Sequence, residues 1–391
     1  MAQLQQAEND AMPVQILQQL SQTPYACTSV TQQSTRPGNF VYRGVLAQPL
    51  TLQNGGRASS IIIKHSTDLA ATYRDSPLDI KRCIFEESLF NSVADFSPPT
   101  TTTTVIKAPR LHLYNRQTSS STQVLEDFSN TTGFKAMLFS PNADSLLPQS
   151  SRTTIGRNLG SWLRSFHTWA SAPERAALRA QLPQDDPMRK LKRLLTYDGF
   201  LRALENYPEL LEGHKETLET IRDVMIKEFE KLPTEGDENL GLIHGDFWSG
   251  NILIPSTGWR EPPPSDGTNE LFIIDWEFAQ FGHRCYDLGQ IVGDLCERKV
   301  YNKIDTGLAV MEGVIDGYGE LSDYMAFRTA IHVGVHLVGY YNRRPQRGPW
   351  VASPEAIVAG MTAGRDFIIK GWEKDRKFFE GSLLASLFTA K

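Results

Sequence analysis

Two short motifs in the second half of this 391-residue chain restrict its fold more than any other feature. The first is His-Gly-Asp-Phe-Trp-Ser-Gly-Asn at 244–251, and the second is Ile-Ile-Asp-Trp-Glu at 273–277. Three apolar runs flank them and have the pattern of short buried strands: 241–243, 252–254 and 271–274. Asp246 and Asn251 therefore share one loop between two strands. Asp275 ends a third strand, so its side chain is expected to emerge beside that loop.

These residue types at this spacing fit the needs of phosphoryl transfer. A hydroxyl group must be aimed at a phosphorus atom, and metal ions must neutralise the phosphate oxygens. Mg²⁺ prefers carboxylate, carbonyl and water ligands. An Asp five residues before an Asn often occurs by chance. The combination of His-Gly-Asp after an apolar strand, Asn251 at that offset and then Asp275 after another strand is much harder to obtain by accident.

The pattern of elements predicts an α+β chain with two lobes. Residues 39–46, 61–64, 111–114 and 123–128 are rich in strand formers, with one helix expected at about 77–93. The second half carries long helical patterns, for example at 155–170 and 215–231. The expected division is an N-lobe at 1–128 and a C-lobe at 129–391.

The two motifs resemble the signature of the aminoglycoside phosphotransferase and choline kinase superfamily. The layout is also similar to fungal small-molecule kinases such as hydroxytryptamine kinase, and it extends from about residue 37 to residue 294. Further segments share in this resemblance: Ser-Ile-Ile-Ile-Lys-His at 60–65, Ile-Phe-Glu-Glu at 84–87 and Tyr-Asp-Leu-Gly at 286–289. The central motif is far more specific than these flanking segments.

The resemblance implies a two-lobed protein-kinase-like fold with a small antiparallel N-lobe, one helix in that lobe and a larger, mainly helical C-lobe. It implies ATP and Mg²⁺ as cofactors and a small-molecule hydroxyl group as acceptor. Asp246 would be the catalytic base, and Asn251 and Asp275 would bind Mg²⁺. Glu277 either supports a second metal ion or only stabilises its loop. The acceptor stays open among an amino alcohol, a sugar, an aminoglycoside and an indole alcohol.

Lys64 is the candidate for the lysine that binds the nucleotide phosphates, because it follows three isoleucines on a predicted strand. Such a lysine needs a carboxylate partner, and Glu86 and Glu87 are the candidates. Apolar residues lie three, four and seven positions from Glu86, which puts it on the inward face of its helix. A carboxylate on a buried face needs a partner, so Glu86 is favoured over Glu87.

The remaining nucleotide contacts rest on the resemblance. Gly38 lies in the segment that corresponds to the loop over the phosphates, which here has one glycine in place of a glycine-rich pattern. Glu126 and Phe128 belong to the segment that corresponds to the linker between the lobes, whose backbone would meet the adenine. The alternative is that this segment is simply the end of a strand.

Five other residues drew separate interpretations. His244 is interpreted as a residue that shapes its loop, since Asp246 already fills the role of base. Asp287 resembles the structural aspartate that braces the catalytic loop, although a helix-start residue is also a common cap. Asp294 is expected to be a solvated acid, with contact to a substrate amine as the alternative. His332 and His336 share a helix face, and a buried or pocket-lining role is favoured over zinc binding.

Composition places few further limits on function. The formal net charge is -5, so neither nucleic acid nor an anionic membrane is expected as a partner. The four cysteines are scattered, which favours a reducing compartment, and the protein is expected to be cytoplasmic. Two rival functions remain at this stage: a catalytically inactive nucleotide-binding scaffold and a protein kinase. Nothing in the sequence bears on oligomeric state.

Overall fold

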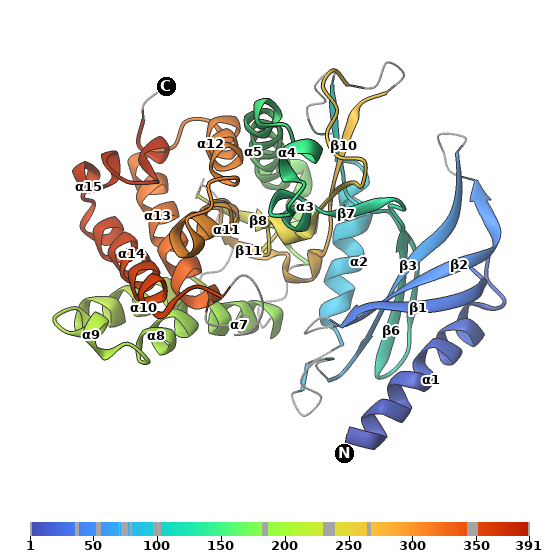
Figure 1. Cartoon of the computed structure of the whole chain (residues 1–391). Helices are drawn as coiled ribbons and strands as arrows, with labels where there is room; N and C mark the ends of the chain where they lie inside the picture. Colours follow the sequence, from blue (N-terminus) through green and yellow to red (C-terminus); the bar gives the residue numbers. More distant parts are fainter. Residues whose placement is uncertain are drawn as a thin grey trace. The chain divides into compact units, whose positions relative to one another are not determined.

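The structure, a computed structural model, divides into two compact units (Figure 1). The first unit is Met1–Asp95 with Ala108–Asn130, and the second is Phe96–Lys107 with Thr131–Lys391. The structure describes residues 2–35, 39–51, 56–69, 71, 77–78, 80–96, 98, 103–181, 187–229, 239–263, 267–341 and 351–389.

The first unit contains an antiparallel sheet of five strands in the order β1-β2-β3-β6-β5. The helices and strands of this unit are α1 (Ala2–Leu20), β1 (Cys27–Thr35), β2 (Phe40–Thr51), β3 (Arg57–Thr67), α2 (Arg82–Val93), β5 (Leu111–Arg116) and β6 (Ser120–Glu126). This sheet confirms the predicted antiparallel sheet of the N-terminal part.

The alternation of side chains along β3 gives the sheet two different faces. Ile61 and Ile63 are fully buried in an apolar cluster with Ile16 and Leu20 of α1. Residues next to each other on a strand point to opposite faces. Lys64 therefore points away from α1, toward the face that α2 covers (Figure 1).

The second unit is mainly helical and carries two small sheets, β4-β10-β9-β7 and β11-β8. Its strands are β4 (Thr104–Lys107), β7 (Thr131–Gly133), β8 (Leu240–Ile243), β9 (Ile252–Pro255), β10 (Asn269–Ile273) and β11 (Gln280–His283). Its α-helices are α3 (Phe134–Leu138), α4 (Ala143–Leu146), α5 (Gln149–Ser171), α6 (Ala176–Arg179), α7 (Pro187–Arg193), α8 (Gly199–Leu204), α9 (Pro208–Leu211), α10 (Lys215–Phe229), α11 (Cys285–Asn302), α12 (Leu308–Tyr318), α13 (Asp323–Tyr341), α14 (Pro354–Glu373) and α15 (Arg376–Glu380). Short 3₁₀ turns occur at η1 (Pro173–Arg175), η3 (Ser249–Asn251), η4 (Trp276–Phe278) and η5 (Ala385–Leu387), and a π-helical turn at η2 (Leu194–Asp198).

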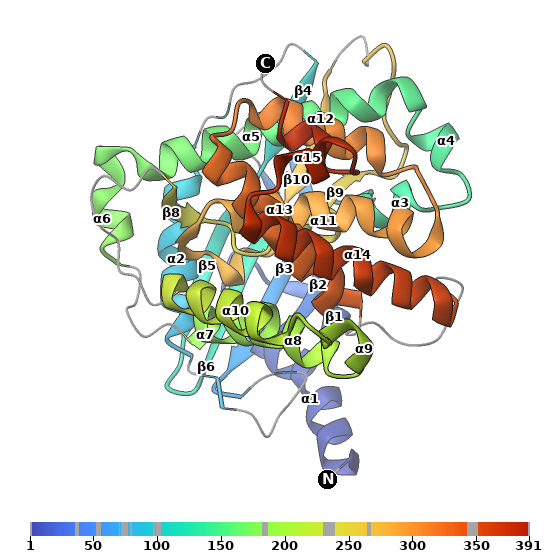
Figure 2. The same ribbon diagram turned by 90° about the vertical axis from the view of Figure 1, so that its left-hand side faces the viewer.

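Helix α5 shows why this unit packs tightly. Five of its apolar residues recur at helical spacing and are buried, which gives the helix one continuous inward face: Ile155, Leu159, Trp162, Leu163 and Phe166. Gly160 allows its backbone to touch α12, because a Cβ atom there would lie 2.1 Å from the carbonyl oxygen of Val314. Helices α11, α13 and α14 pack against one another in the same unit (Figure 2).

Several element boundaries differ from the sequence-based predictions. Strand β1 was not predicted, because its run of Thr, Ser and Gln has little apolar character. The polar Thr run at 100–104 has the composition of a solvated loop, but Thr104 is buried in β4, where the side-chain amide of Asn158 donates to its hydroxyl oxygen at 2.9 Å. Strand β6 ends at Glu126, two residues earlier than expected, and α2 begins at Arg82, five residues later than expected.

The four cysteines are free thiols, three of them buried. Among the described helices, none combines the length and the apolar character needed to cross a bilayer.

Candidate active site

The loop after β8 has a backbone that only glycine fits at one position. Gly245 has φ 77°, in the left-handed region, and a Cβ atom there would lie 2.0 Å from the carbonyl oxygen of Phe278. Any other residue would clash with that backbone and adopt an unfavourable conformation. This explains the glycine between His244 and Asp246.

Asp287 holds this loop in place from the first turn of α11. Its carboxylate accepts the backbone N–H groups of His244 and Gly245, both at 2.8 Å. The imidazole of His167 lies 3.0 Å from the same carboxylate, and its other nitrogen lies 2.9 Å from the hydroxyl of Tyr318. The Asp287 side chain is fully buried. It therefore braces the loop, as the sequence resemblance suggested.

We expect Asp287→Asn to lower the free energy of unfolding by about 2–3 kcal/mol, because an amide leaves one buried loop N–H without its acceptor. Urea unfolding followed by circular dichroism measures this change. Asp305→Asn is the matched control, because Asp305 is exposed and forms a surface ion pair with Lys299, which is worth about 0–1 kcal/mol. Equal stability of the two variants would contradict the bracing role.

His244 links the loop to the segment that carries Asp275. Its Nδ1 atom accepts the backbone N–H of Asp246 at 3.2 Å, and its Nε2 atom lies 3.2 Å from the carbonyl oxygen of Ile274. Burial lowers the pKa of His244, against the raising effect of nearby carboxylates that include Asp287. The neutral ring, protonated on Nε2, satisfies both contacts. His244 thus shapes the loop, in agreement with the sequence interpretation.

The carboxylate of Asp246 accepts hydrogen bonds from four side chains. Lys192 Nζ and Gln290 Nε2 donate to its Oδ1 atom at 2.9 and 2.7 Å. Asn251 Nδ2 and Trp248 Nε1 donate to its Oδ2 atom at 2.8 and 3.1 Å. Four donors saturate a carboxylate, which offers about four acceptor positions.

These contacts keep Asp246 ionised although it is largely buried. Burial alone would raise the pKa of its carboxyl group. The charge of Lys192 and the hydrogen bond from Gln290 outweigh that effect and hold the pKa well below its ordinary value. At neutral pH the group is therefore a carboxylate, the form that can accept a hydroxyl proton.

Asn251 has the properties of a metal ligand. Its amide nitrogen donates to the backbone carbonyl of Asp246 at 3.0 Å as well as to the Asp246 carboxylate. Its Oδ1 atom is buried, and no donor in the described part of the chain lies within hydrogen-bonding distance of it. A buried amide oxygen without a donor suits a hard cation such as Mg²⁺.

Asp275 lies beside Asn251, because the backbone N–H of Ile274 donates to the carbonyl oxygen of Asn251 at 3.0 Å. Its backbone adopts φ 68° and ψ 63°, the left-handed conformation. This conformation costs most L-residues about 1–2 kcal/mol, although Asp tolerates it better than most. The structure therefore brings the predicted residues Asp246, Asn251 and Asp275 into one neighbourhood.

The predicted phosphate-binding lysine lies in the first unit. Lys64 Nζ is 2.8 Å from Glu86 Oε1, and both side chains are buried. Gln123 Nε2 donates to the other carboxylate oxygen of Glu86 at 3.0 Å. Glu87 instead pairs with Arg116. The ion pair is thus the one that the helix pattern favoured, while its role toward a nucleotide stays a prediction.

The structure gives less information about the other residues that were predicted to contact the nucleotide. Glu126 is the last residue of β6, and its backbone N–H donates to the carbonyl oxygen of Arg110 at 2.9 Å. Phe128 is half-buried, two residues beyond the end of that strand. Gly38 lies outside the residues that the structure describes.

Asp294 differs from its sequence interpretation. It was expected to be solvated, but its side chain is fully buried. It pairs with Lys135, and it accepts both the hydroxyl and, at 3.2 Å, the backbone N–H of Ser249. Burial would raise the pKa of the Asp294 carboxyl group, but the charge of Lys135 lowers it overall. Asp294 thus anchors the loop at 244–251 from two turns further along α11 than Asp287.

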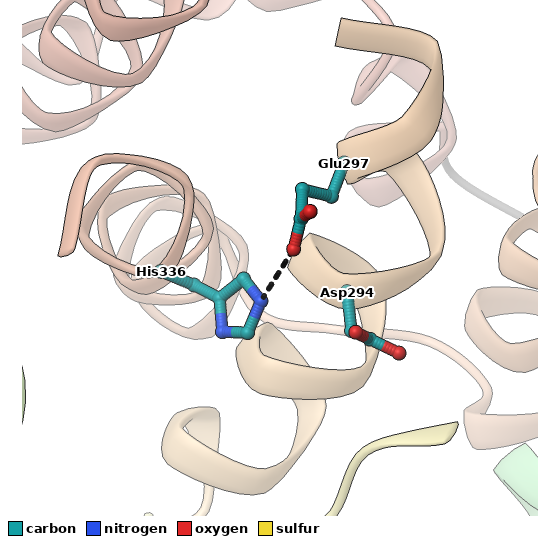
Figure 3. A group of neighbouring side chains, drawn as sticks. All are labelled: Asp294, Glu297 and His336. Atoms are coloured by element: carbon teal, nitrogen blue, oxygen red, sulfur yellow. Dashed lines mark ion pairs between the residues drawn. The ribbon is translucent and has the colours of Figure 1, made fainter. Parts of the chain in front are cut away.

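Asp294, Glu297 and His336 form a buried group whose possible ligand atoms lie within 4.8 Å of one another. Figure 3 shows the His336 ring facing Glu297, with Nε2 and Oε2 3.9 Å apart, while the Asp294 carboxylate points away from the ring. Lys135 and Ser249 already occupy the two oxygens of Asp294. We therefore assign no metal to this group, in line with the buried role expected for His336.

Three residues around Asp246 were not identified from the sequence: Lys192, Gln290 and Trp248. Gln290 follows Asp287 by one helical turn, so its spacing on α11 was a usable signal. Trp248 lies inside the motif, yet nothing in the motif shows that its indole N–H meets Asp246. Lys192 belongs to a helix with several basic residues, and no pattern distinguishes it.

The sequence and the fold of this chain are similar to those of known proteins. Residues 106–327, more than half of the chain, match the phosphotransferase enzyme family. A protein named phosphotransferase FrzJ from Cladobotryum sp is 28% identical over 392 residues, which is 97% of this chain and 97% of the relative. The 4-hydroxytryptamine kinase of Psilocybe cubensis is 27% identical over 99 residues, 25% of this chain and 26% of that protein.

A solved structure has a similar fold. The amicoumacin kinase hAmiN, in complex with AMP-PNP and Ca²⁺, superposes with a TM-score of 0.52. The comparison covers 91% of this chain and 93% of that chain at 14% sequence identity. At this identity the similarity establishes the kinase-like fold and nothing finer.

Proposed function

Because this chain belongs to the phosphotransferase enzyme family, we propose that it transfers the γ-phosphate of ATP, with Mg²⁺, to a hydroxyl group of a small molecule. One observation carries the proposal. The ionised Asp246 carboxylate lies next to Asn251, whose buried amide oxygen has no donor among the described residues. A base for the hydroxyl and a ligand for the metal thus occur side by side.

In the proposed reaction the acceptor hydroxyl donates a hydrogen bond to Asp246, and its oxygen attacks the γ-phosphorus of ATP. A bond forms between that oxygen and the phosphorus, while the bond from the phosphorus to the β–γ bridging oxygen breaks. The electron pair of the broken bond leaves with ADP, and the hydroxyl proton passes to the Asp246 carboxylate. Most of the catalysis would come from positioning and from charge neutralisation.

Asn251 and Asp275 are the residues proposed to hold Mg²⁺, through the Oδ1 atom and the carboxylate. Bound Mg²⁺ supplies positive charge that neutralises the phosphate oxygens. His244 supports this role by linking the two segments, since it contacts both the Asp246 backbone and the Ile274 carbonyl. The proposal leaves Glu277 either a second metal contact or a residue that stabilises its loop.

On the nucleotide side, Lys64 is proposed to bind the phosphates, with Glu86 holding its ammonium group in position. The backbone near Glu126 and Phe128 is proposed to meet the adenine, and the segment of Gly38 to cover the phosphates. The nucleotide-binding role of residues 1–128 and the catalytic role of residues 129–391 form part of the same proposal.

We expect Lys64→Met to raise the KM for ATP about tenfold or more, because a charge-assisted contact to phosphate is lost. The same change leaves Glu86 buried without its cation, which costs about 3 kcal/mol of stability. The double variant Lys64→Met with Glu86→Gln should recover much of that stability without recovering the KM. Steady-state kinetics and thermal unfolding measure the two effects. If the double variant had the original KM for ATP, Lys64 would have only a structural role.

The acceptor class is proposed only as a small hydroxylated molecule. The matched kinase of Psilocybe cubensis is named for 4-hydroxytryptamine, a small hydroxylated amine, but the match covers a quarter of this chain. An amino alcohol, a sugar, an aminoglycoside and an indole alcohol all remain within the proposal. The cytoplasm is the proposed compartment, because the four cysteines are free thiols.

The rival functions have less support. A protein kinase needs a peptide-docking segment after its metal-binding aspartate. Here η4 and β11 take up most of residues 276–283, and α11 begins at Cys285. An inactive scaffold needs no catalytic carboxylate, yet Lys64, Asp246, Asn251 and Asp275 are all present.

A screen for ADP formation over a panel of acceptors tests the proposed function. The panel contains choline, ethanolamine, 4-hydroxytryptamine, a free sugar, an aminoglycoside and a serine-containing peptide. We expect ADP formation that needs both Mg²⁺ and one of the small alcohols. Stimulation by the peptide alone would favour a protein kinase. Nucleotide binding without turnover on any acceptor would favour the inactive scaffold.

A further inference from the structure

Lys192 occupies a position that the proposed reaction does not yet use. It lies in the last turn of α7, just before the π-helical turn η2, and its side chain is only 11% exposed. Its Nζ atom is 2.9 Å from Asp246 Oδ1 and 2.9 Å from Gln290 Oε1. Gln290 in turn donates to the same Asp246 oxygen at 2.7 Å. The three side chains form a closed triangle of hydrogen bonds.

The acceptor hydroxyl has no unoccupied acceptor position on Asp246. Lys192 and Gln290 take Oδ1, and Asn251 and Trp248 take Oδ2. A carboxylate offers about four such positions, so a hydroxyl that binds Asp246 must displace one of these donors. The displaced donor must then find another acceptor, because a buried polar group without a partner is costly.

Lys192 is the donor best suited to move. Its ammonium group has three N–H donors on a flexible four-carbon stem, and its contact with Gln290 remains when it leaves Asp246. Asn251 is held by a second bond, from its amide nitrogen to the Asp246 carbonyl oxygen. Trp248 has a single donor on a rigid ring, and Gly250 packs tightly against that ring, where a Cβ atom would lie 2.3 Å from it.

The transferred phosphoryl group must come within reach of this lysine. A hydroxyl bound to Asp246 lies about 3 Å from the carboxylate, and the phosphorus that it attacks lies about 3–3.5 Å further. Lys192 Nζ starts 2.9 Å from the same carboxylate. Charge accumulates on the phosphoryl oxygens in the transition state, and a cation in a site with little water stabilises it strongly.

Resting on the proposed function, we propose that Lys192 is a catalytic residue that leaves Asp246 when substrates bind and contacts the terminal phosphate of ATP. Gln290 retains one N–H of the ammonium group and guides this movement. The phosphoryl group is transferred as described above, the proton goes to Asp246, and Lys192 keeps its three protons throughout. The alternative role for Lys192 is a fixed counter-ion that never leaves Asp246.

Calorimetric binding of Mg²⁺ with AMP-PNP and of Mg²⁺ with ADP separates these roles, because only AMP-PNP has a γ-phosphoryl group for Lys192 to contact. For Lys192→Met we expect affinity for AMP-PNP to fall about tenfold, while affinity for ADP changes less than twofold. Lys192→Arg should retain most of the difference between the two ligands. Lys190→Met, an exposed residue on the same helix, is the matched control and should behave as the unaltered protein.

A second comparison keeps the test decisive if Lys192→Met folds poorly. Asp246→Asn removes the anion that holds Lys192, so this variant should prefer AMP-PNP over ADP more strongly than the unaltered protein. Adding Lys192→Met to it removes both charges and should abolish that gain. If Lys192→Met weakens the binding of both ligands equally, or of neither, the inference about Lys192 is wrong but the proposed function stands. Failure of the unaltered protein to bind either ligand would overturn the proposed function as well.

Discussion

Asp246→Asn is expected to lower kcat by about 10²–10⁴-fold, the contribution usually measured for a general base. The amide keeps the size of the carboxylate but cannot take the proton of the acceptor hydroxyl. The KM for ATP should not rise, because Asp246 is proposed to handle the acceptor and not the nucleotide. ADP formation at saturating ATP and acceptor measures the change, and Asp246→Ala should abolish turnover in the same way.

The fold should survive this substitution, which separates lost chemistry from lost structure. Asp246 sits in a loop, and 21% of its side chain is exposed. Thermal unfolding of the variant checks this point. Asp316→Asn is a suitable control, because Asp316 is a partly exposed residue that pairs with Arg157 at the surface, and this variant should keep full activity. Normal turnover in the purified Asp246→Asn variant would show that Asp246 does not take part in the reaction.

Asp275→Asn is expected to abolish measurable turnover by removing a carboxylate proposed to bind Mg²⁺. The loss should reach about 10³-fold or more, since electrostatic stabilisation is usually the largest catalytic contribution. Nucleotide binding should lose most of its dependence on Mg²⁺. Titration of ATP in the presence and absence of Mg²⁺ measures this effect separately from turnover.

Substitution by Asn at position 275 removes the negative charge without disturbing the backbone conformation. Asn and Asp both tolerate the left-handed conformation found there, whereas Ala does not. Asp275→Ala should therefore lose activity and, in addition, about 1 kcal/mol of stability relative to Asp275→Asn. If Asp275→Asn keeps both its turnover and its response to Mg²⁺, the proposed metal ligand is wrong.

The central motifs allowed much of the candidate site to be predicted, because its residues are close in sequence or follow strands. Asp246 and Asn251 lie in one loop, and Asp275 follows β10, which pairs with the strand after that loop. The pairing of Lys64 with Glu86 followed from two local periodicities, the strand alternation and the helical spacing of apolar residues. Antiparallel strands in the first half and helices in the second followed from the same two patterns.

Contacts between distant segments could not be predicted in this way. Helix α7 contains four basic residues, and only the packing shows that Lys192 is the one that meets Asp246. The surface role expected for Asp294 was wrong because its cation, Lys135, lies 159 positions away. Strand β1 and the start of β4 were missed because their polar residues gain ladder hydrogen bonds only from neighbours elsewhere in the chain.

These misses have a common physical origin. A buried charge in a folded protein depends on a specific partner, and the partner is chosen by tertiary packing. A local pattern shows that a side chain faces inward, as it did for Glu86, but it does not show which residue will be its partner. Helix α11 illustrates both points. Its regular spacing aligns Asp287, Gln290 and Asp294, but the loop at 244–251 that they hold lies more than 40 positions earlier in the sequence.

Transfer of label from γ-labelled ATP to a small alcohol is the most direct test of the proposed function. The reaction is run with the unaltered protein, Asp246→Asn and Asp275→Asn, each with Mg²⁺ and with a chelator. We predict that label appears on a hydroxyl oxygen of the acceptor only with the unaltered protein and Mg²⁺. Label transfer at an unchanged rate in either variant, or without a divalent cation, would contradict the account.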